Sequence, residues 1–154
     1  MFQYNRISDS VVTNVIYQEG MSVGTSRYSQ TIQVYPNQEY SLDVEVLRSG
    51  LSDANSKISD IKVDGISIGE CNPAGSDNAC DFYECGMIPG TKVFSSPTGS
   101  FVVEVDYVGQ SYQCDCDVST WTCQKSVGSV FGIDNPTQIV AAARINFRPW
   151  GTHD

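Results

Sequence analysis

The sequence has a single histidine, His153, which stands next to the last residue. A nucleophilic triad needs a base held in place, usually a histidine, so Ser-His-Asp chemistry is close to excluded. No glycine-rich loop follows a strand pattern and opens a helix, so nucleotide binding has no support. No spacing of carboxylates marks a glycosidase pair. We therefore expect a protein that is not an enzyme, with a small hydrolase as a distant alternative.

Basic residues are scarce: nine lysines and arginines stand against eighteen aspartates and glutamates, for a formal net charge of −9. Neutralising the phosphates of a nucleic acid takes clustered lysine and arginine, so nucleic acid is not expected as a partner. The same charge disfavours anionic membrane surfaces. No apolar run reaches the roughly 18 residues of a membrane-spanning helix, so membrane insertion is not expected either.

Apolar residues at helical spacing are absent throughout, whereas alternation of apolar and polar residues recurs. Asp64-Gly65, between β-branched residues, predicts a hairpin turn with arms at 60–63 and 66–68. Residues 21–29 predict a loop or a weak edge strand. The remaining predicted strands are 11–17, 31–35, 40–47, 91–95, 101–108, 112–118 and 139–147. The alanine-rich residues 141–143 also suit the start of a helix, but their continuation to Pro149 favours a strand.

About eight or nine short strands, separated by turns and not by helices, predict an all-β fold with antiparallel pairing. The pattern favours a β-sandwich with a jelly-roll-like topology and disulfide-stapled loops. The length of 154 residues fits one domain over residues 1–154, with tails at 1–9 and 150–154.

The six cysteines form two clusters, at Cys71, Cys80 and Cys85, and at Cys114, Cys116 and Cys123. An even number in a β-patterned chain indicates disulfides and an oxidising compartment, so the predicted location is secreted or extracellular. Zinc is the rival interpretation, but the chain has no Cys-x2-Cys knuckle and its histidine lies in the tail. Residues 1–9 have no apolar signal core, so we expect a secreted form to be cut from a longer precursor.

The register of one hairpin predicts one disulfide. Cys114 and Cys116 share a strand face, so each needs a separate partner. A turn at Ser119-Thr120 places Cys116 opposite Cys123, which predicts a cross-strand bridge between them. Cys71–Cys80 and Cys85–Cys114 then follow by elimination.

Calcium is a possible cofactor of loops rich in oxygen ligands. Asp53, Asn55 and Asp60 form one candidate set, although Lys57 at the third ligand position rules out an EF-hand. A second candidate set is Asp77, Asp81, Asp115 and Asp117. The alternative is that these acids are surface residues without metal.

Trp121, at the tip of the predicted hairpin, is the strongest indication of ligand binding. Tyr83, Phe82 and Tyr112 are expected near Trp121 through the disulfides, with Asp115 and Asp117 as polar partners. Flat aromatic rings beside carboxylates suit a sugar, whose C–H face stacks while its hydroxyls seek polar groups. The alternative is that Trp121 covers the cross-strand bridge or fills a corner of the core.

The first functional hypothesis is a non-catalytic extracellular recognition or adhesion module, calcium-assisted and carbohydrate-binding. Its partner is a glycan or a cell-surface protein. The second hypothesis is a structural subunit of a viral particle, filament or cell-surface fibre, which forms homo-oligomers. A recognition module exposes Trp121 and binds as a monomer, whereas a structural subunit buries its aromatic residues between copies.

Overall fold

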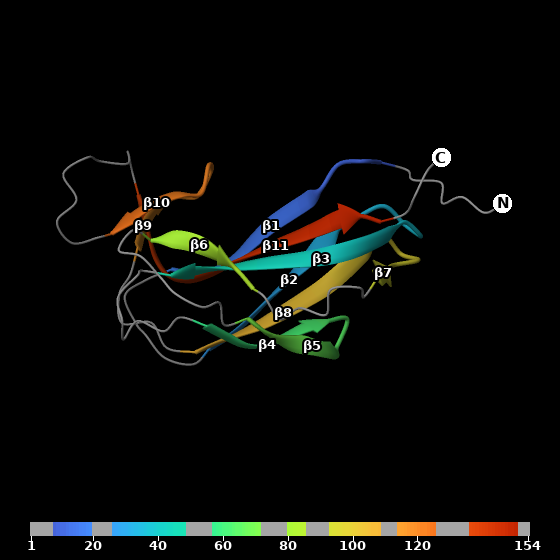
Figure 1. The fold of residues 1–154 in the computed structure, drawn as a ribbon, viewed down its shortest axis with the longest axis horizontal. Coiled ribbons are helices and arrows are strands. Elements are labelled where there is room, and N and C mark those ends of the chain that lie inside the picture. The colour runs from blue at the N-terminus through green and yellow to red at the C-terminus, as the bar shows by residue number, and fades with distance from the viewer. Residues whose placement is uncertain are drawn as a thin grey trace.

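The structure is a computed structural model that describes residues 8–19, 26–48, 57–71, 80–85, 93–108, 114–125 and 136–150. This part of the chain contains eleven strands and only antiparallel pairs, which confirms the predicted all-β class (Figure 1). The strands are β1 (Val12–Glu19), β2 (Ser26–Gln33), β3 (Glu39–Arg48), β4 (Lys57–Val63), β5 (Ile66–Cys71), β6 (Asp81–Glu84), β7 (Val93–Ser95), β8 (Ser100–Val108), β9 (Cys114–Asp117), β10 (Thr122–Lys125) and β11 (Thr137–Pro149).

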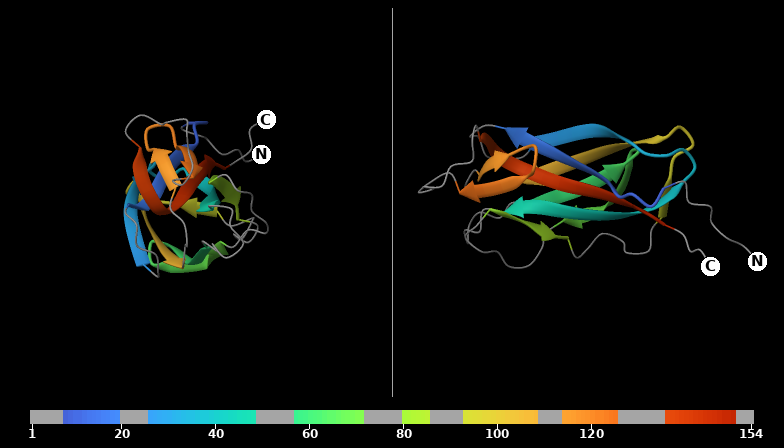
Figure 2. Two further views of the ribbon diagram at one scale, coloured as in Figure 1. Left: turned by 90° about the vertical axis from the view of Figure 1, so that its left-hand side faces the viewer. Right: turned by 90° about the horizontal axis from the view of Figure 1, so that it is seen from above.

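The strands form two sheets. The first sheet has seven strands among the described residues, in the order β10-β9-β11-β3-β6, with β1 also paired to β11 and β7 also paired to β3. The second sheet has four strands, in the order β2-β8-β4-β5. Figure 2 shows the sheets curving around each other into a nearly closed, barrel-like arrangement. The described residues contain no helix long and apolar enough to cross a membrane.

The pairing is nested around one hairpin. Strand β4 pairs with β5, β3 with β6 and β7, β2 with β8, and β1 with β11. The central β4–β5 hairpin turns at Asp64-Gly65, where φ is +50° and +83°. Both values lie in the left-handed region that a two-residue hairpin turn of this kind needs, so the predicted turn is confirmed.

An aromatic cluster joins the two sheets. Tyr40 of β3, Phe101 of β8 and Phe147 of β11 are fully buried. The rings of Phe101 and Phe147 stack with centroids 4.6 Å apart, and Tyr40 meets both rings edge-on. Tyr107 of β8 adds a polar link, because its hydroxyl donates a hydrogen bond to the carbonyl of Ile16 in β1. Burial raises the pKa of Tyr107 well above its usual value, so the hydroxyl stays neutral and remains a donor.

Strands β6 and β4 differ most from expectation. Strand β6 was not predicted, because its four residues between Cys80 and Cys85 are too few to show an alternation; it pairs with β3. Of residues 21–29, expected to be a loop or a weak edge strand, residues 26–29 begin β2 at the edge of the four-stranded sheet, which confirms the edge strand for this part; residues 21–25 lie outside the described residues. Strand β4 begins at Lys57, three residues before the predicted arm.

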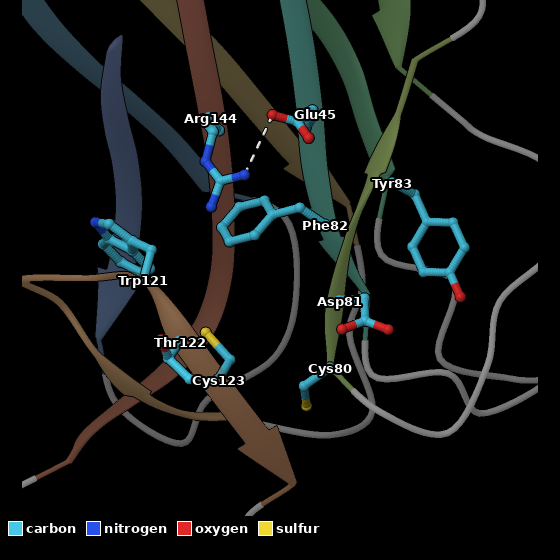
Figure 3. A pocket seen from close by; sticks show the side chains of 9 residues that line it. All are labelled: Glu45, Cys80, Asp81, Phe82, Tyr83, Trp121, Thr122, Cys123 and Arg144. Atoms are coloured by element: carbon cyan, nitrogen blue, oxygen red, sulfur yellow. Dashed lines mark hydrogen bonds and ion pairs between the residues drawn. The ribbon is translucent and has the colours of Figure 1, made fainter. Parts of the chain in front are cut away.

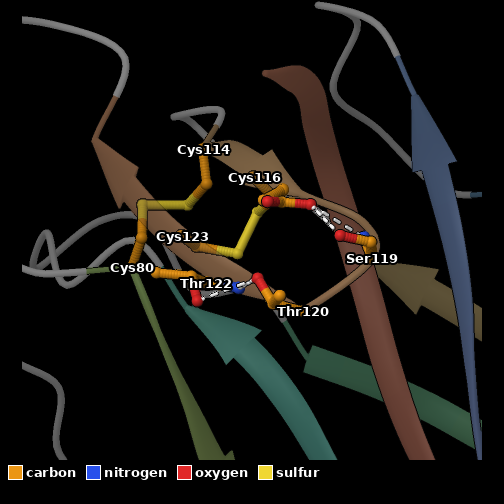
Figure 4. Close-up of a disulfide and its surroundings, with 8 residues drawn as sticks. Cys80, Cys114, Cys116, Ser119, Thr120, Thr122 and Cys123 are labelled. Atoms are coloured by element: carbon orange, nitrogen blue, oxygen red, sulfur yellow. Dashed lines mark hydrogen bonds between the residues drawn. A yellow bond between two sulfur atoms is a disulfide. The ribbon is translucent and has the colours of Figure 1, made fainter. Parts of the chain in front are cut away.

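The three disulfides are Cys71–Cys85, Cys80–Cys114 and Cys116–Cys123. Cys116 lies directly opposite Cys123 in the β9–β10 ladder, so this prediction is confirmed (Figure 4). The predicted Cys71–Cys80 and Cys85–Cys114 pairs are wrong. Strand β6 separates Cys80 from Cys85, so Cys85 follows β6 and reaches Cys71 at the end of β5, while Cys80 precedes β6 and reaches Cys114.

Disulfide mapping tests this connectivity. Digestion without reduction, followed by mass spectrometry, should recover a peptide containing Cys80 joined to one containing Cys114. Reduction of the intact protein should raise its mass by about six daltons, two hydrogens per disulfide. A peptide joined through Cys71 and Cys80 would contradict the position of β6.

Candidate functional site

Strand β11 is buried on both faces where it crosses the seven-stranded sheet. Ala143, Ile145 and Phe147 face the main core between the sheets. Ala142 belongs instead to a second apolar cluster on the outer side of the sheet. The other buried members of that cluster are Leu47, Cys80, Cys114, Cys116 and Ile139. Val15, Tyr17, Phe82, Trp121 and Cys123 are half-buried and pack against it.

A cleft of about 500 Å³ opens beside this cluster, between β6 and β10 (Figure 3). Strand β6 supplies one wall and β10 the other, while β3 and β11 supply charged side chains. The residues lining the cleft are Glu45, Cys80, Asp81, Phe82, Tyr83, Trp121, Thr122, Cys123 and Arg144. The Cys80–Cys114 disulfide joins the residue before β6 to the first residue of β9, and Cys116–Cys123 joins β9 to β10. The two walls are therefore connected covalently.

Trp121 forms an aromatic wall of the cleft. Its ring meets Tyr17 of β1 edge-on, with centroids 5.1 Å apart, and Phe82 of β6 edge-on, with centroids 6.1 Å apart. The side chain is half-buried, so packing against the second cluster, expected as the alternative to ligand binding, is part of its role. The same ring also lines the cleft.

The backbone at Trp121 is unusual for a bulky residue. Its φ is +56°, and its N–H donates a 2.6 Å hydrogen bond to the carbonyl of Asp117, which closes the β9–β10 turn. Glycine or asparagine normally occupies this left-handed region, because a side chain there costs roughly 1–2 kcal/mol. Contacts of the tryptophan ring must offset that cost.

Asp117 stabilises the turn that presents Trp121. Its carboxylate accepts hydrogen bonds from the hydroxyl of Ser119 at 2.6 Å and from the backbone N–H of Ser119 at 2.9 Å. Both bonds lower the pKa of the Asp117 carboxyl, and the bond from the Ser119 hydroxyl has the larger effect. Asp117 therefore caps the turn and does not line the cleft.

Arg144 and Glu45 are opposite each other in the β11–β3 ladder and form an ion pair in the cleft. The Nη1 of Arg144 lies 3.3 Å from Oε1 of Glu45, and its guanidinium carbon lies 4.0 Å from the ring centroid of Phe82. The Nδ2 of Asn146 donates a second hydrogen bond to Oε1 of Glu45 at 3.3 Å. Thr13 donates to Oδ1 of Asn146 at 2.8 Å, so Glu45 is held in place through Asn146 as well as by Arg144.

The structure places the predicted ligand-binding residues at different sites. Trp121 and Tyr83 both line the cleft, but Tyr83 points to the opposite side of β6 from Phe82, because successive side chains of a strand alternate (Figure 3). Asp115 lines a separate polar hollow of about 600 Å³ with Glu19, Pro136, Thr137 and Gln138. Tyr112 lies outside the described residues.

Arg144 and Glu45 were not predicted from the sequence as residues of the site. The alternation of β11 places Arg144 on the polar face of its strand, and that of β3 does the same for Glu45. The sequence does not show the register that places these two residues, 99 positions apart, opposite each other.

The predicted calcium ligands are only partly described. Asp53, Asn55 and Asp77 lie outside the described residues. The carboxylate of Asp60 accepts a hydrogen bond from the hydroxyl of Ser67. Within the described ranges, no group of three or more histidine, cysteine, aspartate or glutamate side chains is arranged to hold a metal ion. Calcium at these loops stays a prediction. All six cysteines are in disulfides, so none is available as a zinc ligand.

Comparison with known proteins found no match: no protein-family model, curated protein or solved structure is similar to this chain.

The backbone at Trp121 yields a test. Trp121→Ala and Trp121→Gly lose the same ring contacts, but glycine adopts positive φ without strain. We expect Trp121→Gly to be more stable than Trp121→Ala by roughly 1 kcal/mol in urea unfolding.

Thr122, the first residue of β10, is the matched control, because its φ is not positive. Thr122→Gly should be less stable than Thr122→Ala, by roughly 0.5–1 kcal/mol. If alanine were the more stable replacement at position 121 as well, the left-handed turn would not be required.

Proposed function

We propose that this protein is a non-catalytic extracellular recognition module that binds a glycan in the cleft between β6 and β10. The observation that carries the proposal is the composition of the cleft: Phe82 and Trp121 supply aromatic surface, and the Arg144–Glu45 pair supplies hydrogen-bonding groups beside it. Aromatic rings next to fixed polar groups are what a sugar needs, because its C–H faces are apolar and its edges carry hydroxyls.

Rigidity supports the same proposal. The cleft of about 500 Å³ falls within the roughly 300–1,000 Å³ usual for small-ligand sites. Two disulfides connect its walls, and an ion pair with a hydrogen-bond chain holds its charged groups. A site ordered before binding loses less conformational entropy when a ligand enters.

The cysteines support an extracellular location. Three disulfides in a chain of this length indicate an oxidising compartment, and secretion is the finer step that we propose. We propose no catalytic step, since both cysteines lining the cleft are disulfide-bonded and Glu45 is paired with Arg144. A calcium ion that assists binding from the loops remains part of the proposal.

The strand order supports a jelly roll as the finer description of the fold. A jelly roll winds a long antiparallel hairpin into two sheets, so that first pairs with last and each inner pair follows in turn. The pairs β1–β11, β2–β8, β3–β6 with β7, and β4–β5 follow that scheme, with the β9–β10 hairpin added between β8 and β11. Lectin domains use this architecture.

A structural subunit is the second candidate, since viral capsid domains also use jelly rolls. Its support is an apolar hollow of about 230 Å³ lined by Val12, Gln33, Val34 and Tyr35, at the first residue of β1 and the last of β2. None of these four residues lines the cleft. A subunit of a particle, filament or fibre self-associates, whereas a recognition module binds as a monomer, so sedimentation velocity distinguishes the two.

A glycan array tests the proposal, run once with calcium and once with EDTA. Wild-type protein should retain at least one glycan, and Trp121→Ala should weaken that binding by about tenfold or more, since the aromatic wall is lost. Binding that disappears in EDTA would place calcium in the site.

Trp150→Ala is the matched control, because Trp150 is the other of the two tryptophans, is exposed, and does not line the cleft. It should bind like wild type. Melting curves of both variants test whether they fold. If Trp121→Ala does not fold, Trp121→Phe replaces it as a milder change. A wild-type protein that retains no glycan would refute the proposal, as would equal losses in the two alanine variants.

A further inference from the structure

We infer that the ligand is an uncharged sugar whose adjacent hydroxyls bind the Arg144–Glu45 pair, and not an acidic sugar. This inference rests on the proposed function and adds the ligand class and the two residues that select it.

Arg144 has donors to spare. One of its N–H groups donates to Oε1 of Glu45, and the guanidinium carbon lies over the ring of Phe82. Among the described residues, none accepts a hydrogen bond from its other N–H groups. The Arg144 side chain is 26% exposed and lines the cleft. Since a guanidinium carries five N–H donors, several remain available to a ligand.

Glu45 has an acceptor to spare. Its Oε1 accepts hydrogen bonds from Arg144 and from Asn146, whereas none of the described groups donates to Oε2. The Glu45 side chain is 21% exposed and lines the same cleft. The site therefore offers donors and an acceptor side by side, in positions set by the β3–β11 register and by the Thr13–Asn146 chain.

Adjacent sugar hydroxyls match this arrangement. A hydroxyl both donates and accepts, so one can accept from Arg144 while its neighbour donates to Glu45. A carboxylate accepts only, so it would satisfy Arg144 and leave Glu45 facing a like charge. The chain as a whole carries −9, which opposes an anionic ligand further.

Paired ligands test the class. Neutral hexose glycosides and the corresponding uronic acids differ only in a CH2OH or a carboxylate, and titration calorimetry at low salt compares them. For the hexose that binds best, we expect the neutral glycoside to have an affinity at least about tenfold higher than its uronic acid. The reason is that the carboxylate of the uronic acid faces the like charge of Glu45. A uronic acid bound as tightly as its neutral counterpart, or more tightly, would overturn the inference.

Paired variants test the residues. Arg144→Gln and Glu45→Gln should each weaken binding of the neutral glycoside by about tenfold or more, because each leaves a group of the site unpaired. Arg148→Gln and Asp43→Asn are the matched controls: the same strands carry this second ion pair, it is exposed, and it does not line the cleft. Each control should bind within about twofold of wild type, since an exposed pair contributes little.

The outcomes separate the inference from the function. Wild-type affinity in both Arg144→Gln and Glu45→Gln, together with loss in Trp121→Ala, would overturn the inference and leave the glycan-binding function standing. Losses in the Arg148 and Asp43 controls as large as those in the cleft variants would also overturn it. A wild-type protein that binds neither neutral nor acidic glycoside would overturn both. Melting curves identify any variant that fails to fold. If Arg144→Gln does not fold, Glu45→Gln alone tests the pair.

Discussion

Side chains along β11 alternate between two buried environments, because successive residues of a strand point to opposite faces of its sheet. Ala143, Ile145 and Phe147 pack between the sheets, where Phe147 stacks on Phe101. On the other face, Ala142 leaves room for the second cluster, and Arg144 reaches the cleft. The strand also pairs with β1, β3 and β9. A slip of one residue would exchange the two faces and place Arg144 in the core.

The disulfides turn the outer face of this sheet into a cleft. Strands β6 and β10 belong to different branches of the sheet, since β6 pairs with β3 while β10 reaches β11 through β9. Cys80–Cys114 and Cys116–Cys123 connect these branches, and Trp121 packs across the gap against Phe82. The hydrophobic core between the sheets therefore stabilises the fold, whereas the disulfides and the aromatic contacts shape the candidate site.

Local patterns in the sequence were enough for the long strands and for one disulfide. Alternation identified β3, β8 and β11, and the hairpin register identified Cys116–Cys123. Strand β6 was missed because four residues between two cysteines are too few to show a period, and its partner is distant in sequence. The predicted pairings of the other four cysteines were wrong because β6 was missed. Arg144 and Glu45 form a pair only through long-range register, which no local pattern contains.

The most direct measurement of the central claim is a two-dimensional 1H–15N NMR titration with a neutral hexose glycoside that the protein binds. The indole N–H of Trp121 and the Nε–H of Arg144 report on the cleft, and the indole N–H of Trp150 reports on a residue outside it. The account predicts that the Trp121 and Arg144 signals shift with a common saturation curve while the Trp150 signal stays in place. Binding that shifts Trp150 and leaves Trp121 and Arg144 unchanged would contradict it.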